Sequence, residues 1–546
     1  MLAAVLATLL AAAAPVVQAA PPPAPAPAAK APPKLVVVIS VDQFSADLFQ
    51  QYRDKFTGGF ARLLTGGVFP NAYQSHAATE TCPGHSTLLT GMRPAHTGII
   101  ANKWVDQRAG RPDTVVYCAE DERVPGSDSK SYTVSDRHLK APTLGEYMKR
   151  ANPASRVVSV AGKDRAAVMM GGHRVDELWW WDGARFRSYA GRATPAVVAD
   201  ANRAVAAEVA QAQPPLTLPG FCRPRDRAIA AGTVTVGTGR FARAAGDADA
   251  FLASPEIDGA TLALAASLRG AMRLGEGAAP DLLIVGASAT DYVGHAYGTE
   301  GSEMCLNLTS LDRDLGDFFG VLDRSGVDYE VVLAADHGGR DLPERQREQG
   351  VAQATRMART LLVKEVGREI GAELHLSGPV LRASENAGDV WIDAGVPAAR
   401  RAAVIAAAVK RYAGDPQVAA VFTHDQIAAQ PMPTGVPTSW SLVERARASF
   451  DPERSGDLYF MLKPMVMAAP TPQKGYVATH GSPWDWDRRI PMLFWRKGMT
   501  PFEQPAPVES VDIAPTLAGT LGVPLPPVDG RCLDLDPRPA STCPNG

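Results

Sequence analysis

The sequence predicts an α/β fold in which a mostly parallel central sheet is flanked by helices. Short runs rich in Val, Ile and Leu are typical of parallel strands that are buried on both faces. Ala-rich stretches with a helical pattern fall between these runs, which places helices on both faces of the sheet. The strand-like runs are 35–41 (LVVVISV), 156–162 (RVVSVAG), 281–288 (DLLIVGAS), 329–335 (YEVVLAA) and 490–495 (IPMLFW), and helices are expected at 195–211, 259–274 and 397–412.

The first 34 residues precede this core. Residues 1–20 form an apolar run closed by small residues, which is typical of a secretory signal peptide, although no Lys or Arg stands at its start. Residues 21–34 are rich in Pro and Ala, and we expect them to form an extended linker. A periplasmic or secreted protein is therefore expected, with membrane contact only through an uncleaved signal anchor.

The remaining residues, 35–546, are expected to form one catalytic domain. Roughly 510 residues are enough for a large core with insertions. Insertions or caps are expected near 176–251 and 345–455, because these stretches carry no recognisable chemistry. The sequence does not fix the oligomeric state, and a monomer is the simplest expectation.

Charge and cysteine content narrow the possible partners. The formal net charge is only −3 and no basic block stands out, so binding to nucleic acid through a broad electrostatic patch is not expected.

The six cysteines contain no CxxC pair, which argues against a zinc ribbon. In an oxidising compartment disulfides are the ordinary expectation. Fifteen complete pairings exist, and we predict only that Cys532 pairs with Cys543.

Polar residues follow four of the predicted strands, at the point where each strand ends. In open α/β sheets, ligands bind beyond the carboxyl ends of the strands, so these residues are expected to meet in one cleft. In chain order they are Asp42, then Lys163 and Arg165, then Asp291, and finally the pair Asp336-His337.

Two of these strand ends suit metal binding. Asp42 taken alone could be an ordinary helix N-cap. Asp336 and His337 are ligands of different types, and the two glycines that follow allow a tight turn, which favours a metal site.

Further metal ligands come from two other segments. Asp291 and His295 are four residues apart, so in a helix they lie on one face and can share an ion. His480 stands beside a glycine, although a lone histidine is more often structural. Together the sequence offers three Asp and three His, which predicts two mixed oxygen and nitrogen metal centres. Imidazole ligands favour zinc or another late divalent metal, and two such ions form a phosphate site.

Thr81 is the candidate nucleophile. It precedes PGHSTLLTG, which is typical of the first turns of a helix, where free N–H groups and the helix dipole favour a phosphate. A divalent metal can activate a threonine hydroxyl as an alkoxide. A plain N-cap role for Thr81 is the alternative, and Thr79, Ser75, Ser86 and the thiol of Cys82 are rival nucleophiles.

Three side chains are candidates for holding the phosphoryl oxygens. Asn102 is one, and Lys163 and Arg165 are the others. In an extended loop Lys163 and Arg165 point to the same side. Arg forms a bidentate fork on phosphate oxygens and Lys adds a point charge, whereas a solvated charged turn is the ordinary alternative.

The ordered motifs resemble the alkaline phosphatase superfamily, and within it the zinc-dependent periplasmic phosphatases of the PafA type. The resemblance spans nearly the whole mature chain. It rests on VISVDQF, TETCPGHSTLLTG, NKW, GKDR, TDYVGHAYG, ADHGG and ATHGSPWDWDRRIPMLFW, and SVDIAPTLAGTLGVPLP is similar to the closing segment of the superfamily.

The resemblance implies a role for each candidate residue. It implies hydrolysis of a broad range of small phosphate monoesters through a phosphothreonine on Thr81, with two Zn²⁺ per chain. One zinc would be held by Asp42, Thr81, Asp336 and His337, the other by Asp291, His295 and His480, and the phosphoryl oxygens by Asn102, Lys163 and Arg165.

Two alternative functions stay open at this point. A phosphodiesterase or nucleotide pyrophosphatase on the same scaffold is disfavoured by Lys163 and Arg165, because a diester would place an uncharged group against these cations. A non-catalytic periplasmic binder of zinc or phosphate is disfavoured because a binder needs no nucleophile such as Thr81.

Overall fold

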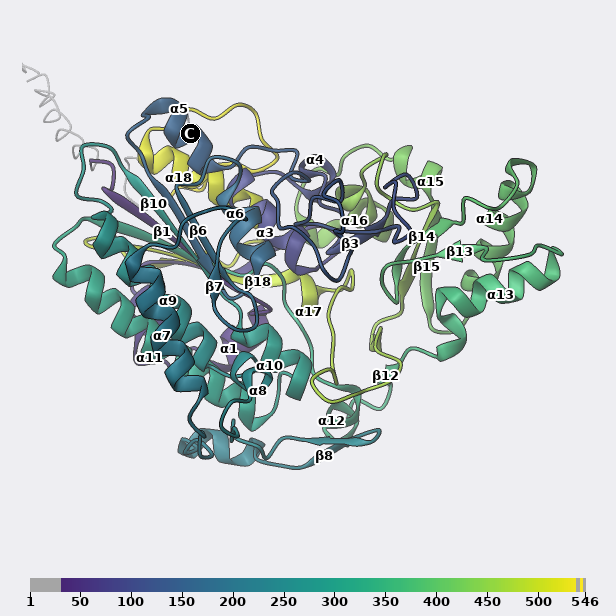
Figure 1. Ribbon diagram of the computed structural model, residues 1–546, viewed down its shortest axis with the longest axis horizontal. Helices are drawn as coiled ribbons and strands as arrows, with labels where there is room; N and C mark the ends of the chain where they lie inside the picture. The colour runs from purple at the N-terminus through teal and green to yellow at the C-terminus, as the bar shows by residue number, and fades with distance from the viewer. Residues whose placement is uncertain (1–30, 537–540, 544–546) are drawn as a thin grey trace, which may run out of the picture.

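The computed structural model describes residues 31–536 and 541–543 (Figure 1). The expected signal peptide, and the expected linker as far as residue 30, lie outside the described residues. Within the described part of the chain, no helix combines the length and the apolar character that crossing a bilayer requires.

The centre of the molecule is a ten-stranded sheet. β1 (Leu35–Val41) lies between β10 (Asp281–Ala287) and β11 (Tyr329–Ala334), parallel to both, and every residue of the three strands is buried. β5 (Val157–Ala161) and β6 (Glu177–Trp181) continue the parallel order beyond β10. Burial on both faces explains why the apolar runs are continuous rather than alternating.

The sheet becomes mixed toward its edges. β18 (Arg489–Arg496) pairs antiparallel with both β11 and β2 (Gly67–Tyr73), so the prediction that it runs parallel was wrong. An apolar run reports burial and not strand direction. Short strands complete the order β19-β2-β18-β11-β1-β10-β5-β6-β7, namely β19 (Phe502–Glu503), β7 (Phe186–Arg187) and, paired with β2, β20 (Val508–Glu509).

Helices cover both faces of this sheet, as predicted (Figure 1). The sheet grows in opposite directions from β5 to β6 and from β10 to β11, and right-handed crossovers therefore put the connecting helices on opposite faces. α7 (Ala196–Val209), α9 (Glu256–Met272) and α11 (Ser302–Arg324) lie on one side, and α3 (Thr81–Thr90), α5 (Leu144–Ala151), α6 (Asp164–Gly171) and α18 (Ile513–Leu521) lie on the other.

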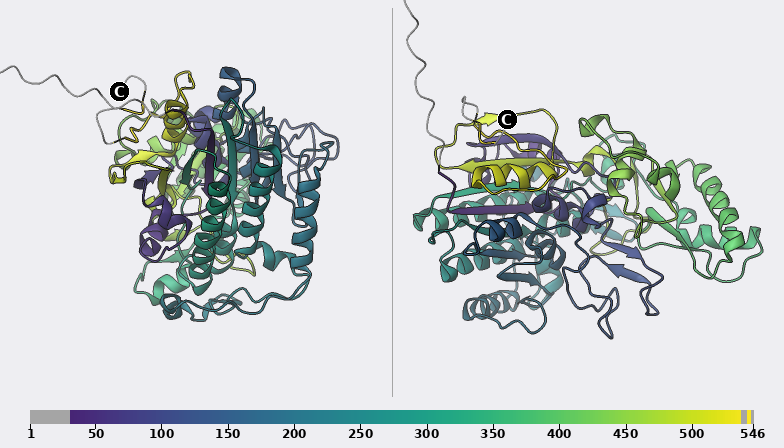
Figure 2. Two further views of the ribbon diagram at one scale, coloured as in Figure 1. Left: turned by 90° about the vertical axis from the view of Figure 1, so that its left-hand side faces the viewer. Right: turned by 90° about the horizontal axis from the view of Figure 1, so that it is seen from above.

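A smaller unit projects to one side of the central sheet (Figure 2). Its four-stranded sheet has the order β13 (Leu381–Arg382), β14 (Gly388–Ile392), β16 (Leu458–Leu462) and β15 (Val418–Thr423). α13 (Val363–Glu373) and α14 (Ala398–Ala413) pack on it around a separate apolar core. The predicted helix at 397–412 is α14, but it covers this small sheet and not the central one.

The other elements are short and form connections and borders. They are α1 (Ala46–Tyr52), α2 (Gly59–Leu63), α4 (Pro94–Thr97), β3 (Lys103–Val105), β4 (Val115–Tyr117), η1 (Gly220–Arg225), β8 (Ile229–Ala231), β9 (Val234–Val236), α8 (Ala248–Leu252), α10 (Ala289–Tyr297), α12 (Pro343–Glu348), β12 (Thr355–Arg356), η2 (Arg359–Leu361), α15 (His424–Ala428), η3 (Pro437–Ser439), α16 (Leu442–Ser449), β17 (Val466–Met467), α17 (Asp485–Arg488) and η4 (Ser510–Asp512).

All six cysteines are paired in disulfides. The predicted bond between Cys532 and Cys543 is present. The other two bonds, which the sequence left open, are Cys82–Cys118 and Cys222–Cys305. Cys82 is therefore not a free thiol beside Thr81, which removes it as a rival nucleophile.

Candidate active site

The six Asp and His residues among the predicted metal ligands gather beyond the carboxyl ends of β1, β10 and β11. The central strands end at one edge of the sheet because they are parallel, and this convergence brings together residues hundreds of positions apart. Asp42 follows β1 directly, Asp336 and His337 follow β11, Asp291 and His295 lie on α10 just after β10, and His480 comes from the loop before α17.

The ligand atoms form two overlapping groups that share His337. Asp42, Asp336 and His337 form one group, and Asp291, His337 and His480 form the other, with the ligand atoms of each group all within 4.8 Å of one another. His295 is close to the second group, because its Nε2 lies 3.3 Å from Asp291 Oδ1. The structure thus brings all six residues into one cluster.

Each imidazole in the cluster is oriented by a backbone carbonyl. The Nδ1 atoms of His295, His337 and His480 lie 2.8, 2.9 and 2.8 Å from the carbonyl oxygens of Ala478, Gly338 and Thr79. When Nδ1–H donates to a carbonyl, Nε2 is left as the lone-pair nitrogen that binds a metal.

Buried atoms without hydrogen bonds point to the same conclusion. Among the described residues, His337 Nε2 and Asp42 Oδ1 are buried and have no hydrogen-bond partner, and they lie 3.5 Å apart. Buried polar atoms are rarely left unsatisfied. A cation between these two atoms would satisfy both, so the donor set fits a bound metal.

The electrostatics of the cluster also favour a cation. Burial raises the pKa of Asp42 well above its ordinary value, and the nearby charge of Asp336 adds to this effect. Burial lowers the pKa of His337 to about 3, so this ring is neutral at neutral pH. Burial alone would lower the pKa of His480, but its contacts with Asp291 raise it to about 9, so this ring is protonated without a metal and a cation bound at Nε2 would replace that proton. Added positive charge would stabilise the ionised carboxylates.

Lys163 supplies part of that positive charge. Its Nζ lies 2.7 Å from Asp42 Oδ2 and 2.5 Å from Asp291 Oδ2, and the ring of Tyr292 packs 4.8 Å from it. Burial alone would lower the pKa of Lys163, but the two carboxylates raise it above its ordinary value. Lys163 is therefore charged and bridges two of the predicted metal ligands.

Thr81 is the first residue of α3, and Glu80 occupies the N-cap position. The alternative that Thr81 is itself the N-cap is thereby wrong. Thr81 is buried, and its Oγ1 lies 3.5 Å from Arg165 Nη2. Its hydroxyl thus stands at the start of a helix and beside a guanidinium group, which is a favourable place for an anion.

Asn102 is fixed beside Thr81 by two hydrogen bonds. Its side-chain Oδ1 accepts from the N–H of Cys82 at 2.8 Å, and its own backbone N–H donates to Glu80 Oε2 at 2.7 Å. Because Oδ1 is used by the backbone, Nδ2 is the part of the amide that is left to donate to a ligand.

The expected geometry of Lys163 and Arg165 was wrong in one respect. α6 begins at Asp164, so the two cations do not lie in an extended loop. Arg165 nevertheless reaches Thr81, and Asp164 is directed elsewhere, accepting hydrogen bonds from Tyr117 and Tyr132 at 2.7 and 2.9 Å. The helical turn separates Lys163, among the carboxylates, from Arg165, beside the hydroxyl.

Two residues of the site were not predicted. Gln43 has a positive φ of 63°, donates its backbone N–H to Asp336 Oδ1 at 3.1 Å and its Nε2 to Asp291 Oδ1 at 3.3 Å. His85 lies one helical turn after Thr81, with Nδ1 at 3.1 Å from Asp336 Oδ2. The i, i+4 spacing from Thr81 could have indicated His85, whereas a lone Gln carries no comparable signal.

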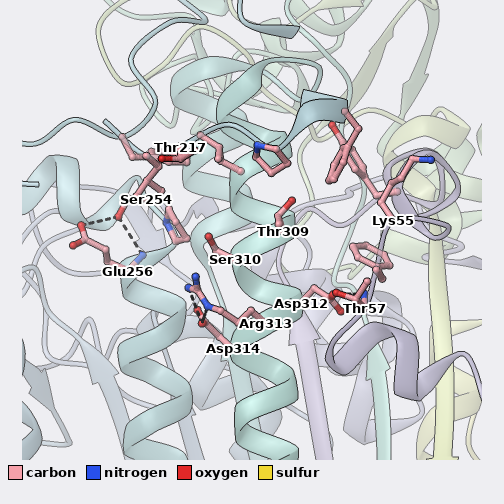
Figure 3. Close-up of a pocket in the computed structure, with 18 of the residues that line it drawn as sticks. Lys55, Thr57, Thr217, Ser254, Glu256, Thr309, Ser310, Asp312, Arg313 and Asp314 are labelled. Atoms are coloured by element: carbon pink, nitrogen blue, oxygen red, sulfur yellow. Dashed lines mark hydrogen bonds and ion pairs between the residues drawn. The ribbon is translucent and has the colours of Figure 1, made fainter. Parts of the chain in front are cut away.

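Two cavities differ in their relation to this cluster. A cavity of about 240 Å³ is lined by Asn102, His295 and His480 together with residues of the small unit. A cavity of about 800 Å³ lies elsewhere, with Lys55 and Thr57 on one side and Ser254 and Glu256 on the other, and none of the predicted site residues lines it (Figure 3). The predicted site therefore lies away from the larger cavity, and Lys163 and Arg165 line a third cavity of about 480 Å³.

Comparisons with known proteins agree with the fold and the motifs. The model of the type I phosphodiesterase / nucleotide pyrophosphatase family matches residues 36–483. Alkaline phosphatase PhoK of a Sphingomonas species is 55% identical over 509 residues, which cover 92% of this chain and 91% of that protein. Alkaline phosphatase PhoD of Zymomonas mobilis is 48% identical over 518 residues, 94% of this chain and 89% of that protein.

A solved structure shows the same fold. The crystal structure of alkaline phosphatase PafA superposes with a TM-score of 0.80 at 27% identity, covering 92% of this chain and 99% of that chain. The predicted α/β class, with a central sheet flanked by helices, is thus confirmed.

Proposed function

We propose that this chain, which belongs to the type I phosphodiesterase / nucleotide pyrophosphatase family, hydrolyses phosphate monoesters to an alcohol and inorganic phosphate. Relatives that are 55% and 48% identical are named alkaline phosphatases, which supports this activity. The observation that carries the proposal is the hydroxyl of Thr81, which stands at the start of α3, 3.5 Å from Arg165, beside the cluster of Asp and His ligands.

We propose that the cluster holds two zinc ions. Mixed imidazole and carboxylate donors suit zinc, and the oriented Nε2 atoms support this choice. When bound, the ions would lower the pKa of a hydroxyl group and offset charge on the phosphoryl oxygens. One ion would be held by Asp42, Thr81, Asp336 and His337, and the other by Asp291, His295 and His480.

The chain's own residues would supply the nucleophile and bind the phosphoryl oxygens. Thr81 Oγ1 loses its proton and attacks phosphorus in line while the bond to the alcohol oxygen breaks and that oxygen takes up a proton, which gives a phosphothreonine and the alcohol. Water then loses a proton and attacks the same phosphorus, the bond to Oγ1 breaks, Oγ1 takes up a proton, and phosphate leaves. Nδ2 of Asn102 and the Arg165 fork hold the phosphoryl oxygens, and the dipole of α3 and the charge of Lys163 add positive potential. Positioning and electrostatics supply most of the rate in phosphoryl transfer.

The test compares an aryl phosphate with a bis-aryl phosphate before and after chelation, with metal content measured on the same samples. We expect about two zinc ions per chain, turnover mainly of the monoester, and loss of both zinc and turnover on chelation. Rapid acid quenching should trap phosphate on Thr81. Full turnover by the metal-free protein would contradict the proposal.

Diester hydrolysis is the second candidate, because the matching family is described by its phosphodiesterase and nucleotide pyrophosphatase activities. The charge beside Thr81 argues against it. A monoester dianion carries one more anionic oxygen for Arg165 to meet than a diester does. Faster turnover of the bis-aryl phosphate in the same experiment would favour the diesterase.

We also propose that the protein works in the periplasm or outside the cell, on a broad range of small phosphate esters. Three disulfides within the described residues support an oxidising compartment. The proposed substrate contacts are all with the phosphoryl group, which every monoester shares, and this supports a broad substrate range. Fractionation of cells that express the full chain tests the location.

A further inference from the structure

We propose that Glu385 and Glu80 form a leaving-group subsite that favours phosphate esters of positively charged alcohols. This inference rests on the proposed monoesterase activity. Both carboxylates line the cavity of about 240 Å³ that Asn102, His295 and His480 also line. Glu385 belongs to the loop between β13 and β14 of the small unit, and Glu80 belongs to the core, so the two face one cavity from separate units.

The position of this cavity suits the departing alcohol. Thr81 is buried and does not line the cavity, whereas Asn102 and His480 do. We infer that a substrate whose phosphorus reaches Thr81 extends its alcohol past Asn102 and His480 into this space. Arg165 and Lys163 instead line a separate cavity of about 480 Å³, which leaves this one to the ester group.

The His480 ring, whose pKa is raised to about 9, offsets part of the carboxylate charge in the cavity when no metal is bound. No Lys or Arg is among the residues that line the cavity. Glu80 accepts a hydrogen bond from the backbone N–H of Asn102 through Oε2. Desolvation in the cavity raises the pKa of Glu385 to about 8, and the nearby Glu80 adds to this effect. A cation bound between the two carboxylates would favour their ionised forms, whereas an anion would be repelled.

The aromatic ring of Tyr476, which lines the cavity, adds to the preference for a cation. This ring stacks on His295 with centroids 4.9 Å apart, and the Tyr476 hydroxyl lies 2.8 Å from Thr479 Oγ1. The ring is thus fixed in place. Ammonium groups bind favourably against aromatic faces, and the nearby carboxylates strengthen this effect.

Glu385→Gln is the variant that tests the subsite. Glu385 is exposed on a loop, so its replacement removes a charge without disturbing a core, whereas Glu80 also holds Asn102. We would measure kcat/KM at about pH 9, above the pKa of about 8 to which desolvation raises the Glu385 carboxyl, for phosphoethanolamine, ethyl phosphate and phosphoglycolate, whose alcohols are cationic, neutral and anionic. For each protein, kcat/KM for the two charged esters is divided by kcat/KM for ethyl phosphate. Comparing these ratios between wild type and variant cancels the differences in intrinsic reactivity among the esters. Glu373→Gln, an equal charge change at the exposed last residue of α13, is the matched control.

We expect Glu385→Gln to lower the phosphoethanolamine ratio about three- to fivefold and to raise the phosphoglycolate ratio by a similar factor. Calorimetry should show tighter wild-type binding of 2-aminoethylphosphonate than of phosphonoacetate, and a smaller difference in the variant. Unchanged ratios, or equal changes in Glu373→Gln, would overturn the subsite while leaving the monoesterase intact. Failure of the wild type to release phosphate from all three esters would instead refute the proposed function.

Discussion

Arg165 is the side chain on which the proposed preference for monoesters depends, because its Nη2 lies 3.5 Å from the hydroxyl of Thr81. We predict that Arg165→Ala lowers kcat/KM for an aryl phosphate by about 10²–10³-fold, the usual effect of losing an oriented donor to a charged oxygen. The loss on a bis-aryl phosphate should stay below about tenfold, since a diester lacks the extra charge. Arg174→Ala, which removes an exposed arginine, is the control. Equal losses on both substrates would contradict the assignment.

Lys163 is less suited to this test than Arg165. Its removal would leave Asp42 and Asp291 buried without their shared cation, and breaking a buried pair costs several kcal/mol. A loss of activity in Lys163→Ala would therefore mix lost substrate binding with lost stability.

The convergence of single residues could be predicted where a strand end or a motif marked them. Asp42, Asp336 and Asp291 stand at such ends, and parallel strands necessarily bring their carboxyl ends together. The contacts of Lys163 could not be predicted, because they depend on where α6 begins. Gln43 was not predicted as a site residue, because its contacts depend on an unusual backbone conformation with a φ of 63°, which the sequence does not display.

At the scale of elements, Asp258 joins α9 to the start of α10, the helix that carries Asp291. Its Oδ1 accepts hydrogen bonds from the backbone N–H groups of Ser288 and Ala289 at 2.7 and 2.9 Å. Burial raises the pKa of Asp258 from 3.8 to about 7, although these hydrogen bonds act in the opposite direction. The folded protein thus binds this proton more tightly than the unfolded chain, so its contribution to stability falls as the pH rises from about 4 to about 7.

Asp258→Asn should remove this pH dependence, since the amide keeps an oxygen acceptor and carries no charge. We predict that the free energy of unfolding of the variant, relative to wild type, increases from pH 5 to pH 8 by on the order of 1–2 kcal/mol. Urea unfolding at the two pH values measures it. Asp258→Ala, which lacks the acceptor, should be less stable than Asp258→Asn at both. A relative stability that does not change with pH would show that Asp258 does not titrate in this range.

The type of an element, helix or strand, was predicted more reliably than the elements that it packs against or pairs with. The run at 35–41 coincides with β1, and the predicted helix at 259–274 lies largely within α9. The direction of β18 and the location of α14 were not predictable, because an apolar pattern shows that a face is buried and not which surface covers it.

The whole molecule combines the central unit with a smaller one that borders the candidate site. The proposed insertion at 345–455 contains β13, β14 and β15, whose sheet is completed by β16 just beyond it. The proposed insertion at 176–251 includes β6 and β7, which extend the central sheet. Both stretches were proposed as insertions because they lack recognisable motifs. Motifs indicate chemistry, and they do not show which sheet a strand joins.

The disulfide between Cys82 and Cys118 links the two segments that hold Asn102. Cys82 N–H donates to Asn102 Oδ1 at 2.8 Å, and Cys118 N–H donates to Asn102 O at 2.9 Å. We predict that replacing both cysteines by Ala lowers kcat/KM for an aryl phosphate by about 10- to 100-fold, because small displacements of positioned groups have effects of this size. Replacing Cys532 and Cys543 instead, far from the candidate site in sequence, should change it less than about twofold. Circular dichroism would establish that both variants fold, and equal kinetic losses in the two folded proteins would argue that the bond at Cys82 stabilises the chain without positioning Asn102.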